Sequence, residues 1–257
     1  MNRRWNLLFL VPLLAALFAY LLTQQLSYTA VAFVLGYLLM EGMRFALLPP
    51  HLHRAAQQYQ RGNLERAMAL TEKSIAARPD RWEARYLLAL IQFNSAHLDQ
   101  AEESARQAVR LKPDESAAHL VLGQILFAQG RYSEAREAFK DALAGGGTLG
   151  INQYHAAATA YRLNDCTEAI PRFELALRLG VDNRQLELLA TYYLADCLLR
   201  SGNGEEADKF HRKLSSYKSA LENLRHDLHV VPDYPERRAL SRDVEAIAQI
   251  ISNMASN

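Results

Sequence analysis

The chain has 257 residues, with 29 Lys and Arg against 28 Asp and Glu and a formal net charge of +1 at pH 7. This length accommodates one substantial domain, or an anchor followed by a domain. The near balance of charge, without an acidic or basic tail, gives no electrostatic basis for binding nucleic acid. The two cysteines, Cys166 and Cys197, match neither a disulfide framework nor a CxxC metal site and favour a reducing compartment.

Two apolar segments, residues 7–22 and 30–40, lie near the N-terminus and are separated by the polar link TQQLSYT. With the residues that adjoin them, each becomes long enough to cross a bilayer as a helix. We therefore predict a membrane anchor over residues 1–48, with transmembrane helices at about 5–25 and 28–48. A cleaved signal peptide is the competing interpretation, but the second apolar segment and the absence of a small-residue cleavage site disfavour it.

The positive charges that flank these segments predict their orientation. Arg3 and Arg4 precede the first segment, the link has no Lys or Arg, and Arg44, Arg54 and Arg61 follow the second segment. Because positive residues remain on the cytoplasmic side, both termini are expected in the cytoplasm. The expected location is the inner membrane of a bacterium.

Glu41 and Arg44 are three residues apart at the inner end of the second predicted span. The simpler interpretation is an ion pair at the headgroup boundary. The alternative is a polar contact between the hairpin and a membrane-protein partner, in addition to the lipid that the hairpin would contact.

Beyond Pro50 the sequence repeats with a period of 34 residues, and three columns of small residues share this period. The first column consists of alanines: Ala67, Ala101, Ala135 and Ala169. The second lies five residues earlier, at an expected turn: Gly62, Ala96, Gly130 and Asn164. The third lies twelve residues before each alanine: Ala55, Ala89, Gly123 and Ala157.

This pattern predicts pairs of antiparallel helices. Two helices need small residues where their backbones come closest, and the turn between them favours a residue that tolerates a left-handed conformation. Pro79 and Pro113 would end the first two units, because proline cannot continue the helical hydrogen-bond ladder. Since one helix pair cannot bury its apolar face alone, the pairs are expected to stack into an all-α solenoid.

The third unit, LVLGQILFAQGRYSEAREAFKDAL, resembles the tetratricopeptide repeat (TPR) family most closely. The matching positions are Leu122, Gly123, Gly130, Ala135, Phe139 and Ala142. A fifth unit is expected over 185–214, where Ala207 falls 38 residues after Ala169 because the preceding loop is longer. The resemblance covers roughly residues 48–214 and implies a repeat domain of about five helix pairs over 49–214.

Residues 215–257 are expected to form a C-terminal helical extension, with one helix after Pro235. An apolar stripe follows this helix at steps of three and four residues: Leu240, Val244, Ile247, Ile251 and Met254. A helix that caps the last open face of the solenoid is the simpler interpretation. A helix that binds a partner is the alternative.

The family resemblance implies that the array binds other proteins on its concave face, with residues of the first helix of each pair. The residues expected to line this groove are Tyr59, Tyr86, Phe93, Leu120, Phe127, Tyr154, Tyr161, Arg162, Tyr192 and Arg200. The alternative is that these side chains pack between neighbouring repeats. Some members of the family bind a terminal carboxylate with Lys, Asn and Arg at set positions of the first helices. This carboxylate clamp is missing here, because the chain has apolar residues at those positions: Leu52, Ala56, Leu87, Ala117 and Val121.

No motif indicates an enzyme, a cofactor, a metal site or a small-molecule substrate: GxSxG, HExxH and P-loop patterns are all absent. The sequence therefore predicts a membrane-anchored TPR scaffold that binds protein partners at the cytoplasmic face, as an assembly factor for a membrane complex. A permanent structural subunit of such a complex is the first alternative. An enzyme or metal carrier is a more distant one.

Overall fold

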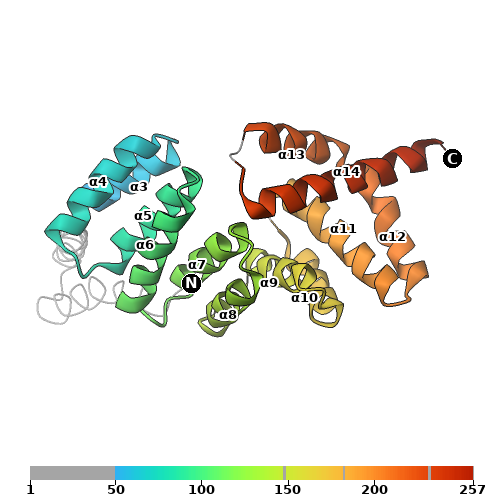
Figure 1. Ribbon diagram of the computed structural model, residues 1–257, viewed down its shortest axis with the longest axis horizontal. Coiled ribbons are helices and arrows are strands. Elements are labelled where there is room, and N and C mark those ends of the chain that lie inside the picture. The colour runs from blue at the N-terminus through green and yellow to red at the C-terminus, as the bar shows by residue number, and fades with distance from the viewer. Residues whose placement is uncertain (1–49, 147–148, 182, 231–232, 257) are drawn as a thin grey trace, which may run out of the picture. The chain divides into compact units, whose positions relative to one another are not determined.

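The computed structural model describes residues 50–146, 149–181, 183–230 and 233–256 (Figure 1). The chain divides into two compact units, residues 1–74 and 75–257, and each is described by itself. The predicted hairpin, including Glu41 and Arg44, lies outside the described residues. Within the described ranges, no helix is both long enough and apolar enough to cross a membrane.

The regular elements in these ranges are all helices, as the periodicity predicts. The first unit contains α3 (Pro50–Gln60) and most of α4 (Leu64–Ala77). The second unit continues with α5 (Trp82–Asn94), α6 (Leu98–Leu111), α7 (Ser116–Ala128), α8 (Tyr132–Ala144), α9 (Gly150–Arg162), α10 (Cys166–Leu179), α11 (Arg184–Arg200) and α12 (Gly204–Leu214). The expected helix pairs and the fifth unit are therefore confirmed.

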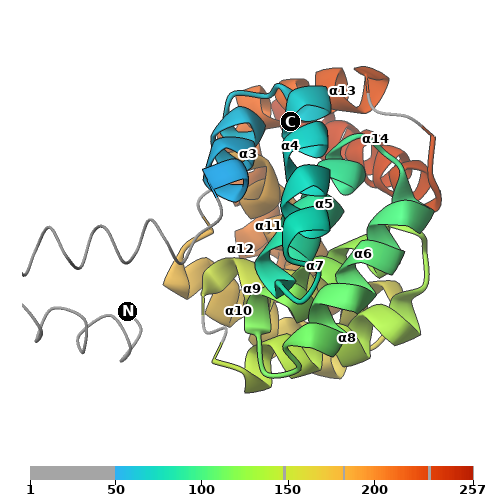
Figure 2. The same cartoon turned by 90° about the vertical axis from the view of Figure 1, so that its left-hand side faces the viewer.

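The C-terminal extension contains more than the one helix that the sequence predicts. A single 3₁₀ turn, η1 (Ser215–Tyr217), leads into α13 (Lys218–Val230), and α14 (Pro235–Ser256) follows. Figure 2 shows α13 and α14 next to each other, and the two helices are in contact. Of the predicted apolar stripe on α14, Val244, Ile247 and Ile251 are buried.

The turns inside the helix pairs share one geometry. Each contains a residue with positive φ: Gly62 (76°), Ala96 (57°), Gly130 (78°), Asn164 (59°) and Gly202 (83°). After each of these residues, the next backbone N–H donates to the carbonyl five positions earlier, for example Arg131 to Leu126 at 2.9 Å. This bond is the signature of a helix that ends in a left-handed residue, so the predicted turn column is confirmed.

The alanine column lies where helices cross. Ala67, Ala101, Ala135 and Ala169 are all fully buried, and so is Ala207 in the fifth pair. The third pair shows why the other column is small: a Cβ built on Gly123 would lie 2.6 Å from the Phe139 ring. Phe139 is itself 1% exposed, so the ring has little space to move away.

In the second unit, each helix contacts the next one along the chain from α5 to α12. We call the surface formed by the first helices of the pairs (α5, α7, α9 and α11) the inner face. The surface formed by the second helices (α6, α8, α10 and α12) is the outer face. Helix α14 contacts both α7 and α12. The last helix therefore lies on the inner face as well as against the last pair.

The pairing of the two cysteines differs from what the sequence predicts. Cys166 at the start of α10 and Cys197 inside α11 form a disulfide, with their Cα atoms 5.2 Å apart. The prediction that they match no disulfide was wrong because it considered motifs alone. Cys166 starts the second helix of the fourth pair and Cys197 lies inside the first helix of the fifth pair, and these two helices are in contact.

Candidate functional site

Three of the predicted groove residues line one cavity on the inner face of the second unit. Phe93, Phe127 and Tyr154 come from α5, α7 and α9, which are the first helices of three successive pairs. The cavity has a volume of about 190 Å³ and its wall is mainly apolar. Phe93 and Phe127 are one repeat period apart, whereas Tyr154 lies seven residues before Tyr161, the residue equivalent to them in its repeat.

The C-terminal extension covers this cavity. Tyr234, Glu236 and Leu240 line it together with the three aromatic residues. The turn glycine of the third pair approaches the same segment closely, since a Cβ on Gly130 would lie 3.1 Å from Cβ of Pro235. A helix of this chain therefore occupies the face that the sequence predicts for a partner.

Arg162, the last residue of α9, connects the inner face to α14. Its Nη2 donates to Glu236 Oε1 at 2.6 Å and to Asp243 Oδ2 at 2.6 Å. Tyr132 donates its hydroxyl to Glu236 at 2.7 Å, and Tyr193 donates to Asp243 at 2.8 Å. One guanidinium and two phenols thus hold two carboxylates of the same helix.

This cluster, which we call the Arg162 cluster, is buried. The Arg162 side chain is 9% exposed, and its guanidinium carbon lies 5.2 Å from the centre of the Tyr193 ring. Burial raises the pKa of Glu236 above its usual value, and the hydrogen bonds from Arg162 and Tyr132 oppose this rise. The hydrogen bonds therefore offset the effect of burial on Glu236 only in part.

His155 is a second titratable group beside the cavity. Its ring stacks on Phe139 at 5.6 Å and lies 2.8 Å from the side-chain amide of Gln124 through Nε2. Burial lowers the pKa of His155 to about 4, because the surroundings disfavour the imidazolium. The ring is therefore neutral at neutral pH.

Other predicted groove residues lie outside this cavity, at the contact between α9 and α11. Tyr161 stacks on Tyr193 at 4.3 Å and donates to Asp196, which also pairs with Arg200. Tyr192 is half-buried next to Tyr193. In these places the rings also pack between neighbouring repeats, which is the alternative that the sequence leaves open.

The other predicted residues lie nearer the N-terminus. Tyr86 contacts the Trp82 ring and, like Leu120, packs against the core of the second and third pairs. Tyr59 is half-buried and belongs to the first unit. Of the positions that hold a carboxylate clamp in other proteins, Leu52, Leu87 and Val121 are buried as core residues.

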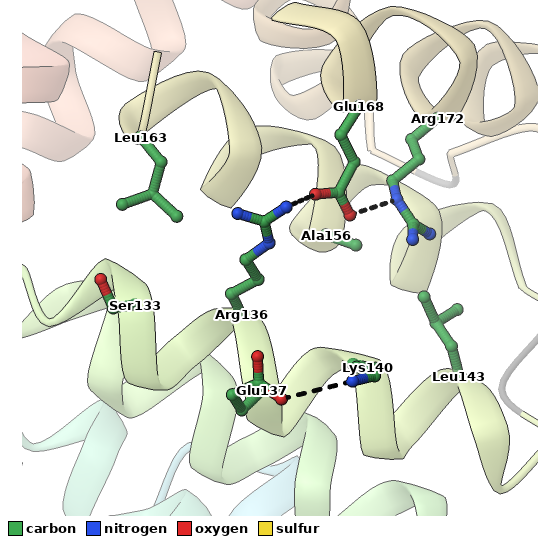
Figure 3. Close-up of a pocket in the computed structure, with 9 residues that line it drawn as sticks. All are labelled: Ser133, Arg136, Glu137, Lys140, Leu143, Ala156, Leu163, Glu168 and Arg172. Atoms are coloured by element: carbon green, nitrogen blue, oxygen red, sulfur yellow. Dashed lines mark hydrogen bonds and ion pairs between the residues drawn. The ribbon is translucent and has the colours of Figure 1, made fainter. Parts of the chain in front are cut away.

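The outer face has a larger and more polar hollow, of about 780 Å³, between α8 and α10 (Figure 3). Arg136 points across it from α8 and pairs with Glu168 at 2.5 Å, and Arg172 pairs with the same carboxylate at 2.9 Å. The charges that line the hollow thus pair with one another. Across the described ranges, no three His, Cys, Asp or Glu side chains are grouped to hold a metal ion.

The sequence did not predict several residues that line the cavity or belong to the Arg162 cluster. These residues are Tyr132, Tyr193, Tyr234, Glu236 and Asp243. Tyr193 adjoins a predicted residue, and Pro235 does mark the start of a helix. No periodic signal, however, indicates that this helix returns to the inner face, because it lies outside the repeats.

The comparisons with known proteins agree with this geometry. The family model described as tetratricopeptide repeat matches residues 92–148 and 154–210. The helix pairs in these two ranges therefore match the tetratricopeptide repeat model. No curated protein sequence matches the chain.

Several solved structures share the fold. The crystal structure of MamA has a TM-score of 0.54 at 19% identity, with 67% of this chain and 95% of that chain covered. MamA 41-end from Desulfovibrio magneticus RS-1 has a TM-score of 0.57 at 15% identity, covering 66% and 94%. YrrB, described as a TPR protein with an unusual peptide-binding site, has a TM-score of 0.56 at 17% identity, covering 68% and 91%. At these identities the likeness shows the fold.

Proposed function

We infer that the protein is a membrane-anchored TPR scaffold. It holds a protein partner on the inner face of its repeats, next to the cytoplasmic side of the bilayer, while a membrane complex is assembled. The observation that carries this proposal is the inner face itself, where residues of successive repeats already hold a helix. A surface that binds one helix has the shape and chemistry to bind another.

The remaining parts of the proposal rest on the sequence. The apolar segments in residues 1–48 support anchoring, and the flanking arginines support a cytoplasmic location. TPR arrays generally bind proteins and carry out no chemistry, and the peptide-binding site named for YrrB supports the same role here.

Crosslinking in the native membrane tests the proposal. The full chain is compared with Phe93→Ala/Phe127→Ala, which removes two cavity rings, and the captured proteins are identified. We expect about a tenfold loss of capture with little change in the melting temperature, because aromatic anchors dominate binding at such sites. Equal loss of capture and of stability would mean that the rings only pack between repeats, and would contradict the proposal.

A matched control is Leu111→Ala/Leu179→Ala, which truncates two exposed apolar residues at the ends of outer helices. It should retain capture. A variant without residues 1–48 should lose partners that need the membrane. Co-purification of one partner in fixed stoichiometry would favour a permanent subunit over an assembly factor.

A further inference from the structure

The two halves of α14 are held by different forces. In residues 235–243 the one buried side chain is charged, Glu236. In the second half, Val244, Ile247 and Ile251 are buried in the core formed by α9 to α13. The second half is therefore an apolar cap, whereas the first half depends mainly on polar contacts.

The first half presents one face to the inner surface. Glu236, Leu240 and Asp243 follow at steps of four and three residues, which places them along one side of a helix. Both carboxylates contact Arg162, and Leu240 lines the cavity. The inner face thus recognises three side chains along two turns of α14.

Arg162 obtains its carboxylate partners from this helix. Among the described residues, Glu236 and Asp243 are the carboxylates within ion-pair distance of its guanidinium. Without them, Arg162 would retain the rings of Tyr161 and Tyr193 and the Tyr193 hydroxyl. A buried cation left in this way is costly, so the open groove favours an acidic occupant.

The first half of α14 fits its site incompletely. Leu240 lines an apolar cavity of about 190 Å³ that the helix does not fill, so packing contacts are forfeited there. One arginine faces two carboxylates, and burial raises the pKa of Glu236. These features are those of an occupant that another helix can replace.

We propose that the inner face is a receptor for a helix with two carboxylates seven residues apart and an apolar residue between them. Residues 234–243 occupy this receptor within the chain, and the protein partner displaces them with a helix of the same pattern. The second half of α14 remains in place as a cap. This proposal rests on the proposed scaffold function and identifies both the partner chemistry and the regulation of the same site.

A binding experiment with the full chain tests the receptor. The probe is a fluorescent peptide with the sequence of residues 233–247, and its matched control carries Glu236→Gln and Asp243→Asn. Anisotropy is measured with the wild-type protein and with a protein variant that carries the same two substitutions. We expect the acidic peptide to bind the variant at least tenfold more tightly than the wild type, because the site is then weakly occupied.

The control peptide should bind the variant at least tenfold more weakly than the acidic peptide. Adding Arg162→Met to the variant should abolish the difference between the two peptides. Equal binding of both peptides, or no binding of either, would overturn the proposal. Circular dichroism and the melting temperature establish that each variant is folded.

A second measurement uses the wild-type protein and needs no substitution. Amide hydrogen exchange should be faster in residues 235–243 than in 244–254, and excess acidic peptide should accelerate exchange in the first range only. Equal protection of both ranges, unchanged by the peptide, would show that α14 is a cap along its whole length. The proposal would then be wrong whatever the variants do.

The outcome separates this proposal from the scaffold function. Peptide binding without any partner captured on the membrane would support the receptor and contradict the scaffold. Partner capture that depends on Phe93 and Phe127, without selective binding of the acidic peptide, would support the scaffold and contradict the acidic pattern.

Discussion

Two clusters in the second unit use the same chemistry on opposite faces. On the outer face, Arg136 and Arg172 flank Glu168, and the Arg136 side chain is 43% exposed (Figure 3). In the Arg162 cluster on the inner face, one arginine lies between two carboxylates and is 9% exposed. The distances are similar, so burial rather than geometry distinguishes the two clusters.

This difference determines what each cluster does. Water and ions screen the outer pairs, which leaves each of them worth about 0–1 kcal/mol. The inner charges have lost most of their water, so the loss of one partner leaves the others uncompensated. The outer cluster thus adds little to the joint between repeats, whereas the inner one controls whether the first half of α14 is bound.

The largest expected effect is that of Arg162→Met. It leaves Glu236 and Asp243 without a cation, and we expect the free energy of unfolding to fall by about 3–5 kcal/mol or α14 to detach locally. Urea unfolding measures the first result and hydrogen exchange in α14 the second. Arg136→Met is the matched control on the outer face. If both variants shift unfolding equally and α14 stays protected in both, burial does not distinguish the clusters.

Reduction of the disulfide comes next. The bond joins the outer helix α10 to the inner helix α11 across 31 residues, and closing a loop of this size is worth about 4 kcal/mol. Urea unfolding with and without reductant measures the loss. The variant Cys166→Ala/Cys197→Ala should be insensitive to reductant, and an equal response in both proteins would show that the bond adds no stability.

The same bond also tests the predicted orientation. Structural disulfides persist in oxidising compartments and are rare in the cytoplasm of most organisms. The flanking arginines predict a cytoplasmic repeat domain. Free thiols at both cysteines in intact cells would agree with that orientation, whereas a stable disulfide there would contradict it.

A smaller effect is expected from acid. Because burial lowers the pKa of His155 to about 4, the unfolded chain binds a proton at this residue before the folded chain does. Stability should therefore fall as the pH is lowered from about 6.5 towards 4, by about 3 kcal/mol in total. Urea unfolding at a series of pH values measures this. In His155→Gln this part of the pH dependence should disappear, and its persistence would assign it to other groups.

The smallest effect is that of salt on the outer cluster. The stability lost through Arg136→Met should be below about 1 kcal/mol and should vanish between about 0.05 and 0.5 M NaCl. The loss caused by Arg162→Met should persist over the same range. A loss that disappears for both variants would mean that water reaches the inner cluster as freely as the outer one.

Much of the fold follows from the sequence because the repeat is local and periodic. Small residues mark the turn and the helix crossing of one pair, as at Gly123, Gly130 and Ala135. Equivalent positions recur every 34 residues. The cavity-lining role of Phe93 and Phe127 follows from the same register. The disulfide does not follow from the period, because Cys166 starts a second helix and Cys197 lies inside a first helix, so their positions are not equivalent.

The occupant of the groove could not be predicted in this way. Arg162 is 74 residues from Glu236 and 81 from Asp243 in the chain, and no repeat relates these positions. The apolar stripe of α14 predicts that one side is buried, and the structure confirms this for Val244, Ile247 and Ile251. It does not predict that the first two turns of α14 lie against α7 and α9, because that depends on a loop with no pattern of its own.

The left-handed conformation of Ala96 suggests a substitution that stabilises the protein for laboratory work. The equivalent turns use Gly or Asn, whereas alanine in this conformation is strained by about 1–2 kcal/mol. Ala96→Gly relieves the strain and adds some flexibility to the unfolded chain, for a net gain of about 0.5–1 kcal/mol. Because the substitution adds no side chain and changes no charge, it provides a more stable background in which destabilising variants of either face remain folded.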